Sequence, residues 1–210
     1  MCGRATYKLT WEEIVALYRL KLGQPAVNTR ARYNVCPTIT IDTILDQDAK
    51  RRLEQMRWGL IPSWWSKPLK EMKLATFNAR AETVATKPMF RSAFKRNRCL
   101  IPVSGYYEWQ DTPGGKQPWY FTARDGSPAL TIAGIWDEWL DMEADRSRKS
   151  CTMIITAACS RPRGGGSSSM KMVAGPESGC GVSNRRKATG RAKGLASRKH
   201  QIRPIYAELQ

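Results

Sequence analysis

Cys2 has the most distinctive chemistry in the chain, because it directly follows the initiator methionine. Initiator methionine is normally removed when the next side chain is small, and removal here would leave a free α-amine and a thiol on one residue. The amine can condense with an aldehyde to an imine, which the thiol then closes to a thiazolidine ring. With a pKa of about 7.7–8.0, roughly a tenth of such an amine is free base at pH 7. Cys2 therefore indicates aldehyde capture, although many proteins without this chemistry also have a small second residue.

Side chains that could hold a phosphate occur at two places. Arg4 stands two residues after Cys2, and Gly3 between them would let a ligand approach the backbone closely. In the stretch 78–83, Asn78 offers a donor and an acceptor that could position a nucleophile, while Arg80 suits a bidentate grip on phosphate. The alternative for this stretch is a strand end followed by a polar turn.

Glu108 lies within the aromatic segment Gly105–Trp109. A carboxyl group between aromatic side chains is expected to lose water, which raises its pKa toward the range of a general acid. Opening a closed sugar hemiacetal to its aldehyde needs such proton transfers. The alternative is that Glu108 sits on the solvent-exposed face of an alternating strand.

Adjacent tryptophans, Trp64 and Trp65, stand in a proline-bounded stretch that also contains Lys67. Neighbouring residues of a strand point to opposite faces, so burying both rings together is difficult. An exposed ring could stack on bases or wedge between them. The alternative is that the pair anchors the core.

The charge of the chain favours a polyanionic partner. The 35 lysine and arginine residues outnumber the 18 acidic residues, for a net charge of +17 and an isoelectric point near 10.0. Residues 160–210 hold 11 basic and 2 acidic residues, and residues 1–159 hold 24 and 16, so both parts are basic. Nucleic acid is therefore the first partner to consider, with a solvated basic surface as the alternative.

Cysteine and histidine spacing does not favour a metal site. The six cysteines, at positions 2, 36, 99, 151, 159 and 180, show no C-x-x-C spacing, and the sole histidine is His200. We therefore expect neither metal nor cofactor. We also see no signal peptide and no run of 18 apolar residues, which leads us to expect a reduced, cytoplasmic setting associated with the nucleoid.

The first predicted element is a helix over about 10–22. Thr10 and Glu13 form a capping box, and Leu9 and Ile14 have the spacing of a hydrophobic staple. Ile14, Leu17 and Tyr18 continue one apolar face. This helix would anchor the chain shortly after Cys2 and so keep the first residues close to the domain.

Further along, short apolar runs alternate with turns and predict strands. The runs are 38–45, 54–61, 75–80, 99–109, 117–123, 129–136 and 151–156. A second helix is predicted near Pro88, with inward side chains at Met89, Phe90, Ala93 and Phe94. The predicted fold class is α+β, with a mixed or antiparallel sheet system and flanking helices. We assign residues 1–159 to this domain and residues 160–210, which hold 8 of the 16 glycines, to a basic Gly/Ser-rich disordered tail.

Taken together, these segments resemble the SRAP family of SOS response-associated peptidases or abasic-site-processing proteins. The similarity covers about residues 2–158 in the family's order. Each motif is weak alone, and the combination is specific. The matching segments are Met1–Arg4, Arg32–Asn34 with Pro37, Trp58–Gly59, Trp64–Trp65, Asn78–Thr83, Met89–Phe90, Gly105–Trp109 and Met153–Thr156.

The resemblance implies a monomeric sensor of abasic sites in single-stranded DNA that forms a stable thiazolidine crosslink and shields the lesion. It also implies lyase-type and self-processing peptidase activity. Cys2 would supply amine and thiol, Asn78 would orient the terminus, and Glu108 would assist ring opening and ring closure. The DNA strand would be contacted by Arg4, Asn34, Arg80 and Thr156, and a wedge beside the lesion would be formed by Pro37, Trp64 and Trp65.

The chain departs from the family pattern after Thr156. The family there has an active-site histidine within an I-H-x-R-x-P motif, followed by further closing elements, whereas this chain continues as the basic stretch 161–210. His200 lies in that stretch and is not expected to substitute. Loss of the imidazole would slow ring opening or lyase chemistry, while capture through Cys2 is the activity expected to persist.

Two other functions are compatible with the sequence. One is an N-terminal-nucleophile peptidase or amidase, in which the amine of Cys2 acts as base and its thiol attacks a carbonyl. The other is a non-catalytic basic protein that binds nucleic acid mainly through the stretch 160–210, with steep salt dependence and no preference for abasic sites.

Overall fold

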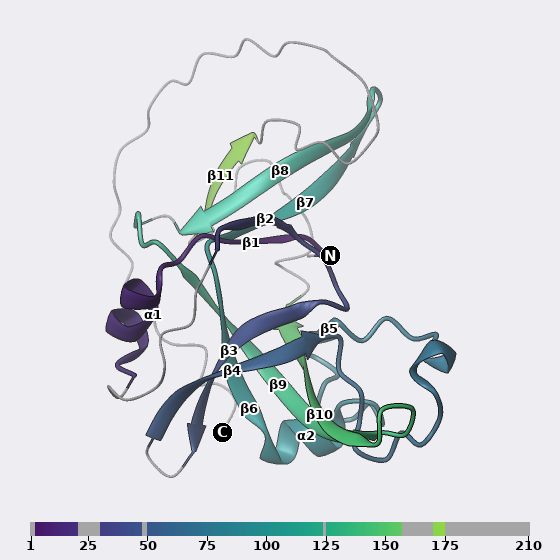
Figure 1. Ribbon diagram of the computed structural model, residues 1–210. Coiled ribbons are helices and arrows are strands. Elements are labelled where there is room, and N and C mark those ends of the chain that lie inside the picture. Colours follow the sequence, from purple (N-terminus) through teal and green to yellow (C-terminus); the bar gives the residue numbers. More distant parts are fainter. Residues whose placement is uncertain (1–2, 21–29, 48–49, 124, 157–169, 175–210) are drawn as a thin grey trace. The chain divides into compact units, whose positions relative to one another are not determined.

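The computed structural model describes residues 3–20, 30–47, 50–123, 125–156 and 170–174 of the 210-residue chain (Figure 1). All of these belong to one compact unit, Met1–Gly175. Strands dominate the described residues, which contain two α-helices and one 3-10 helix. Cys2, His200 and most of the predicted tail lie outside the described residues.

A six-stranded sheet forms one half of this unit (Figure 1). β10 pairs in parallel with both β4 and β5, and the other pairings of the sheet are antiparallel. The pairing of β10 with β4 joins two strands from opposite parts of the sheet order, so the sheet curls into a barrel. In spatial order the strands are β4 (Lys50–Trp58), β3 (Thr40–Gln47), β6 (Arg98–Val103), β9 (Leu130–Asp141), β10 (Arg146–Ile155) and β5 (Asn78–Arg80).

The other sheet has five strands and is antiparallel throughout. Its spatial order is β11 (Met170–Ala174), β8 (Gly115–Ala123), β7 (Gly105–Thr112), β1 (Ala5–Tyr7) and β2 (Arg32–Val35). A single residue, Ser104, separates β6 from β7, so the chain passes directly from one sheet to the other. Ser104 is held there because its N–H donates to the Thr6 carbonyl at 2.8 Å and its hydroxyl accepts from the Lys8 N–H at 2.8 Å.

Both sheets contribute side chains to the largest hydrophobic cluster. Alternating residues of a strand point to opposite faces, and the inward face of each sheet supplies the apolar set. The five-stranded sheet contributes Ala5, Tyr7 and Val35. The barrel contributes Ile41, Leu45, Met56, Trp58, Cys99, Ile101, Val103, Trp136, Cys151 and Met153.

The first helix, α1 (Trp11–Tyr18), has the predicted start and an earlier end. The capping box is confirmed, since the Glu13 N–H donates to Thr10 Oγ1 at 3.2 Å and the Thr10 N–H donates to Glu13 Oε2 at 2.8 Å. Arg19 ends the helix in the left-handed conformation, with φ 52°. The predicted end near residue 22 is therefore wrong. Leu17, predicted on the apolar face, is 43% exposed.

The second helix, α2 (Arg91–Arg96), begins slightly later than predicted. Hydrogen-bonded turns occupy the preceding residues, for example from the Lys87 N–H to the Thr83 carbonyl at 3.0 Å. The predicted inward side is confirmed. Phe90 and Ala93 are buried, and Met89 and Phe94 pack against the same cluster.

The fold class differs from the prediction in its helix content. The mixed and antiparallel sheets are confirmed, and the described residues are mostly β-structure rather than α+β with flanking helices. The apolar runs correctly located the strands of the barrel and the β7–β8 hairpin, although β5 begins only at Asn78. β1 and β2 were missed because they are only three and four residues long. β11 pairs with β8 from within the segment assigned to the tail.

Gly105 is required where β7 begins, because the neighbouring strand approaches it closely. A Cβ atom at Gly105 would lie 2.5 Å from the Tyr120 ring and 2.6 Å from the Phe121 carbonyl oxygen. The Tyr120 hydroxyl is itself fixed by a 2.6 Å hydrogen bond with Thr6 Oγ1. Gly105→Ala should therefore lower the free energy of unfolding by about 1–3 kcal/mol, measured by denaturant unfolding.

Gly114 in the β7–β8 turn is the matched control. A Cβ atom there would have Thr112 Oγ1 as its nearest neighbour at 4.0 Å, and its φ is not positive. Gly114→Ala should leave stability almost unchanged. Equal effects of the two alanines would contradict the close-approach argument.

Candidate functional site

The beginning of the chain is held beside β7. Ala5 pairs with Tyr106 in the β1–β7 ladder, and the Tyr107 N–H donates to the Arg4 carbonyl at 2.9 Å. Cys2 is outside the described residues and stands two positions before Arg4 in the sequence. The pairing of β1 with β7 therefore places Arg4 and Ala5 beside the strand that carries Glu108.

Glu108 is on the inward side of β7, with an exposed fraction of 4%. Tyr106 on the same side is also buried and stacks on Phe121, with ring centroids 5.1 Å apart, whereas Trp109 is 41% exposed. Burial raises the pKa of the Glu108 carboxyl. The alternative of a solvent-facing Glu108 is therefore wrong, and the carboxyl has the desolvation expected of a general acid.

Arg4 and Asn34 are brought together by the pairing of β1 with β2. Arg4 Nη1 donates to Asn34 Oδ1 at 3.1 Å and also contacts Cys36 Sγ. Arg4 is half-buried and Asn34 is exposed. These contacts hold the Arg4 guanidinium beside β2.

Pro37 lies in the turn that follows β2 and is half-buried. The next residue, Thr38, has a positive φ of 78°, and its N–H donates to the Trp58 carbonyl at 2.7 Å. The Trp58 N–H in turn donates to the Ile39 carbonyl at 2.8 Å. The end of β4 therefore determines where Pro37 stands.

Trp64 and Trp65 differ in exposure, which excludes burial of the two as joint core anchors. Trp64 is 53% exposed and Trp65 is half-buried, with ring centroids 6.2 Å apart. The loop is held to β9, because the Ser63 N–H donates to Asp137 Oδ2 at 3.0 Å. An exposed indole on an anchored loop has the geometry needed to stack on a base.

Asn78 and Arg80 are the ends of the short strand β5, which runs parallel to β10. Asn78 pairs with Met153 and is half-buried, while Arg80 pairs with Ile155 and is exposed. Thr156 is exposed and directly follows β10. Arg80 and Thr156 therefore lie at the same end of the two strands. The description of this stretch as a strand end with a polar turn also holds, since turns follow β5.

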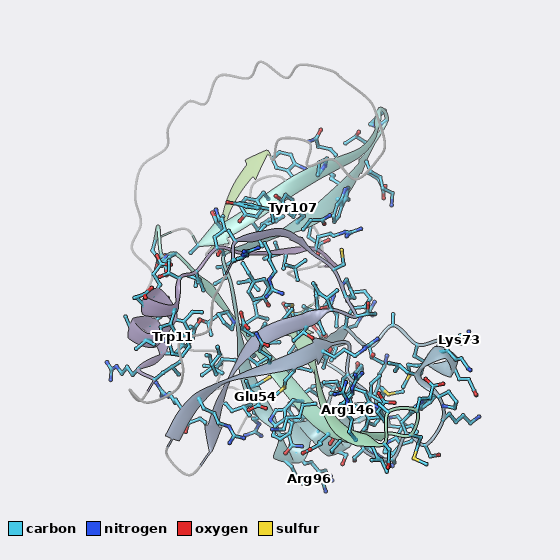
Figure 2. All side chains as sticks on the ribbon, viewed as in Figure 1. Trp11, Glu54, Lys73, Arg96, Tyr107 and Arg146 are labelled. Carbon is cyan, nitrogen blue, oxygen red and sulfur yellow. The ribbon has the colours of Figure 1, made fainter. Side chains whose placement is uncertain are left out.

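The predicted residues fall into two groups on different sheets. Asn34 and Glu108 belong to the five-stranded sheet, which Arg4 directly precedes and where Figure 2 also labels Tyr107. Asn78, Arg80 and Thr156 belong to the barrel or directly follow it. Sequence reasoning placed Trp58 in the matching segment Trp58–Gly59 but assigned it no structural role. Its indole N–H donates to the carbonyl of Phe77, next to Asn78, at 2.9 Å.

Two of the described internal cysteines, Cys99 and Cys151, are poor nucleophiles. Cys99 and Cys151 are buried in the core, and burial raises the pKa of both thiols. Among the residues that the structure describes, no group of three or more histidine, cysteine or acidic side chains could hold a metal. No helix in the described part of the chain is long and apolar enough to cross a membrane.

The fold has counterparts among solved structures. A protein from Bacteroides thetaiotaomicron matches with a TM-score of 0.65 and 26% identity, over 74% of this chain and 68% of that one. A protein from Bordetella bronchiseptica matches with a TM-score of 0.63 and 26% identity, over 74% and 72%. This chain thus has the mixed β architecture of these proteins over most of its described residues.

Residues 1–163 match the SRAP family, SOS response associated peptidase, and the chain belongs to that family. It is similar to the abasic site processing protein YoqW of Bacillus subtilis, with 34% identity over 74% of this chain and 68% of the relative. It also resembles the abasic site processing protein HMCES of Xenopus tropicalis, with 30% identity over 73% and 57%. The predicted family resemblance is therefore confirmed.

The buried carboxyl of Glu108 predicts a defined pH dependence. Because its pKa is raised in the folded chain, rising pH ionises the unfolded chain first, and stability falls from the ordinary glutamate pKa of about 4.3 up to the folded pKa. The glutamine side chain of Glu108→Gln does not ionise, so this variant does not lose stability as the pH rises. Its stability relative to the unchanged protein should therefore increase between pH 4 and pH 7, by about 1.4 kcal/mol for each unit of pKa elevation.

Thermal unfolding of both proteins across this pH range measures the effect. Glu143→Gln, which removes a carboxylate whose side chain is 57% exposed, is the control and should show little change. A constant difference between Glu108→Gln and the unchanged protein at all pH values would rule out the raised pKa.

Proposed function

We propose that this protein captures abasic sites in single-stranded DNA as a covalent thiazolidine through the amine and thiol of Cys2. The observation that carries the proposal is the β1–β7 pairing, which holds the start of the chain along the strand of the buried Glu108. Family membership and the names of the relatives, abasic site processing proteins, support the same lesion. A cytoplasmic, nucleoid-associated location is proposed on the sequence expectation alone.

The reaction is balanced without a cofactor. Glu108 donates a proton to the ring oxygen of the closed deoxyribose, the C1′–O4′ bond breaks, and the anomeric hydroxyl gives its proton to water, which leaves the C1′ aldehyde. Water then returns a proton to the Glu108 carboxylate. The α-amine of Cys2 attacks C1′, and loss of one water gives the imine. The thiol adds to the imine carbon while the nitrogen takes up the thiol proton, which closes the five-membered ring. One C–N bond and one C–S bond form, one water leaves, and nothing is oxidised or reduced.

The predicted DNA contacts would surround this reaction. Arg4, fixed by Asn34, and the exposed Arg80 would neutralise backbone phosphates beside the lesion. Asn78 would orient the reacting terminus, and Thr156 would add a hydroxyl contact at the end of β10. Pro37 and Trp64 would close the space left by the missing base, because an exposed indole can occupy the place of a stacked base.

The covalent product gives the direct test. Protein incubated with an abasic single-stranded oligonucleotide should give a heat-resistant band on a denaturing gel, and Cys2→Ala should give none. Intact mass should equal demethionylated protein plus oligonucleotide minus one water. Glu108→Gln should slow the reaction by about 10²–10⁴-fold, as expected for loss of a general acid. A retained Met1, or an equal band from Cys2→Ala, would overturn the proposal.

The role of Trp64 is tested by non-covalent binding in the Cys2→Ala background. Trp64→Ala should weaken binding to the abasic strand by about 1–3 kcal/mol, the contribution of one stacked base. Trp64→Phe is the matched control, because it keeps an aromatic face and should retain most of the affinity. Fluorescence anisotropy measures both. If alanine and phenylalanine give the same affinity as tryptophan, the wedge does not exist.

A peptidase activity is the second candidate, favoured by the family description as a SOS response associated peptidase. It would use the same processed Cys2, with the amine as base and the thiol as nucleophile. Peptide and amide substrates separate the two functions. Turnover of these substrates without crosslinking would favour the peptidase, and reaction with the aldehyde alone would exclude it beyond removal of the protein's own first residue.

A further inference from the structure

A groove of about 730 Å³ lies on the barrel, between the start of β3, the end of β4 and the β9–β10 hairpin. Its charged lining consists of Arg57, Arg146, Arg148, Lys149, Glu54 and Glu138, four cations against two carboxylates. Figure 2 labels two of these lining residues, Glu54 on β4 and Arg146 at the start of β10. The groove therefore has the charge balance of an anion site.

Arg57 is held in place on the groove wall. Its Nη1 donates to the Gly59 carbonyl at 2.7 Å, and a Cβ atom at Gly59 would lie 2.6 Å from that nitrogen. Glycine at this position therefore leaves the space that the guanidinium occupies. Burial and the nearby charge of Arg148 both lower the pKa of Arg57. A bound anion would relieve this repulsion between two fixed cations.

Two of the other cations are already paired. Lys149 Nζ lies 3.0 Å from Glu54 Oε1, and Arg148 Nη1 lies 3.2 Å from Asp141 Oδ2. Within the described residues, Arg146 has no ion pair. Arg57 and Arg146 therefore face the groove with charge that the carboxylates of Glu54 and Asp141 do not neutralise.

The position of the groove connects it with the proposed DNA interface. Thr38, which lines the groove, directly follows Pro37, and its hydroxyl can donate to an anion. Leu69 also lines the groove and belongs to the 3-10 helix η1 (Leu69–Glu71), which follows the Trp64–Trp65 loop in the sequence. The groove therefore adjoins the turn of Pro37, which belongs to the proposed wedge.

We propose that this groove binds a backbone phosphate of the DNA strand beyond the wedge, with Arg57 and Arg146 as its main cationic contacts and Arg148, which also pairs with Asp141, beside them. The inference rests on the proposed function for the identity of the strand. A phosphodiester fits because guanidinium groups match phosphate oxygens in charge and geometry. The contact carries no sequence information, so it would hold any single strand in register while the lesion is captured.

The salt dependence of binding tests the groove. In the Cys2→Ala background, affinity for abasic and intact single strands is measured across salt concentrations with Arg146→Ala/Arg148→Ala. Removal of one phosphate interaction should reduce the slope of log affinity against log salt by about 0.7 for a single strand. The reduction should be the same for abasic and intact strands.

Arg51→Ala/Lys116→Ala is the matched control, since it removes the same charge. Arg51 pairs with Asp46 at 3.1 Å in the β3–β4 hairpin, as Arg148 pairs with Asp141, and neither Arg51 nor Lys116 lines the groove. The control should keep the original slope. If it changes the slope equally, the effect belongs to net charge, and the groove is not a phosphate site.

Thermal unfolding checks that the variants fold, and Arg146→Ala alone carries the test if the Arg148 change unfolds the protein. An unchanged slope overturns the inference. The inference is also overturned if calorimetry shows that inorganic phosphate binds the groove while the groove variants leave DNA binding unaltered. If the slope is reduced but the protein forms no Cys2-dependent crosslink, the proposed function is refuted and the phosphate site is retained. If the crosslink forms but the slope is unchanged, only the phosphate site is refuted.

Discussion

The fully buried side chain of Trp58 is the constraint on which the arrangement of the candidate site depends. Its indole N–H donates to the Phe77 carbonyl at 2.9 Å, and its ring packs edge-on against Phe77 with centroids 6.0 Å apart. Its backbone pairs with Thr38 and Ile39, and the next N–H, of Gly59, donates to the Cys151 carbonyl. One residue thus connects the turn at Pro37, the entrance to β5 and the middle of β10. Removing the indole would leave the Phe77 carbonyl with only the Met153 N–H, at 3.1 Å, as its donor and would open a large cavity beside it.

The site is assembled almost wholly from contacts between distant parts of the sequence. The β1–β7 ladder joins Ala5 to Tyr106, and the β5–β10 ladder joins Asn78 to Met153. Such pairings form only when the long intervening segments are ordered, so the residues next to the chain start and the buried Glu108 come together in the folded chain alone.

Local patterns in the sequence predicted local structure well. The capping box at Thr10 and Glu13 and the apolar strand runs were correct because neighbouring residues determine them. The end of α1 was missed because Arg19, not a glycine, adopts the left-handed conformation. Alternation along β7 left two choices for Glu108, and only the packing of Tyr106 on Phe121 shows which face is covered. The groove was invisible because Arg57 and Arg146 are far apart in sequence.

The pairing of β4 with β10 also affects how this chain meets other proteins. A curled barrel hides the backbone amides and carbonyls that an open sheet would present to a stray strand. In the five-stranded sheet β2 stays at the margin, and its register with β1 shifts between Ala5 and Tyr7. Such a bulge interrupts a straight row of donors and acceptors. A highly basic chain with these two sheets is thereby less prone to polymerise through its own strands.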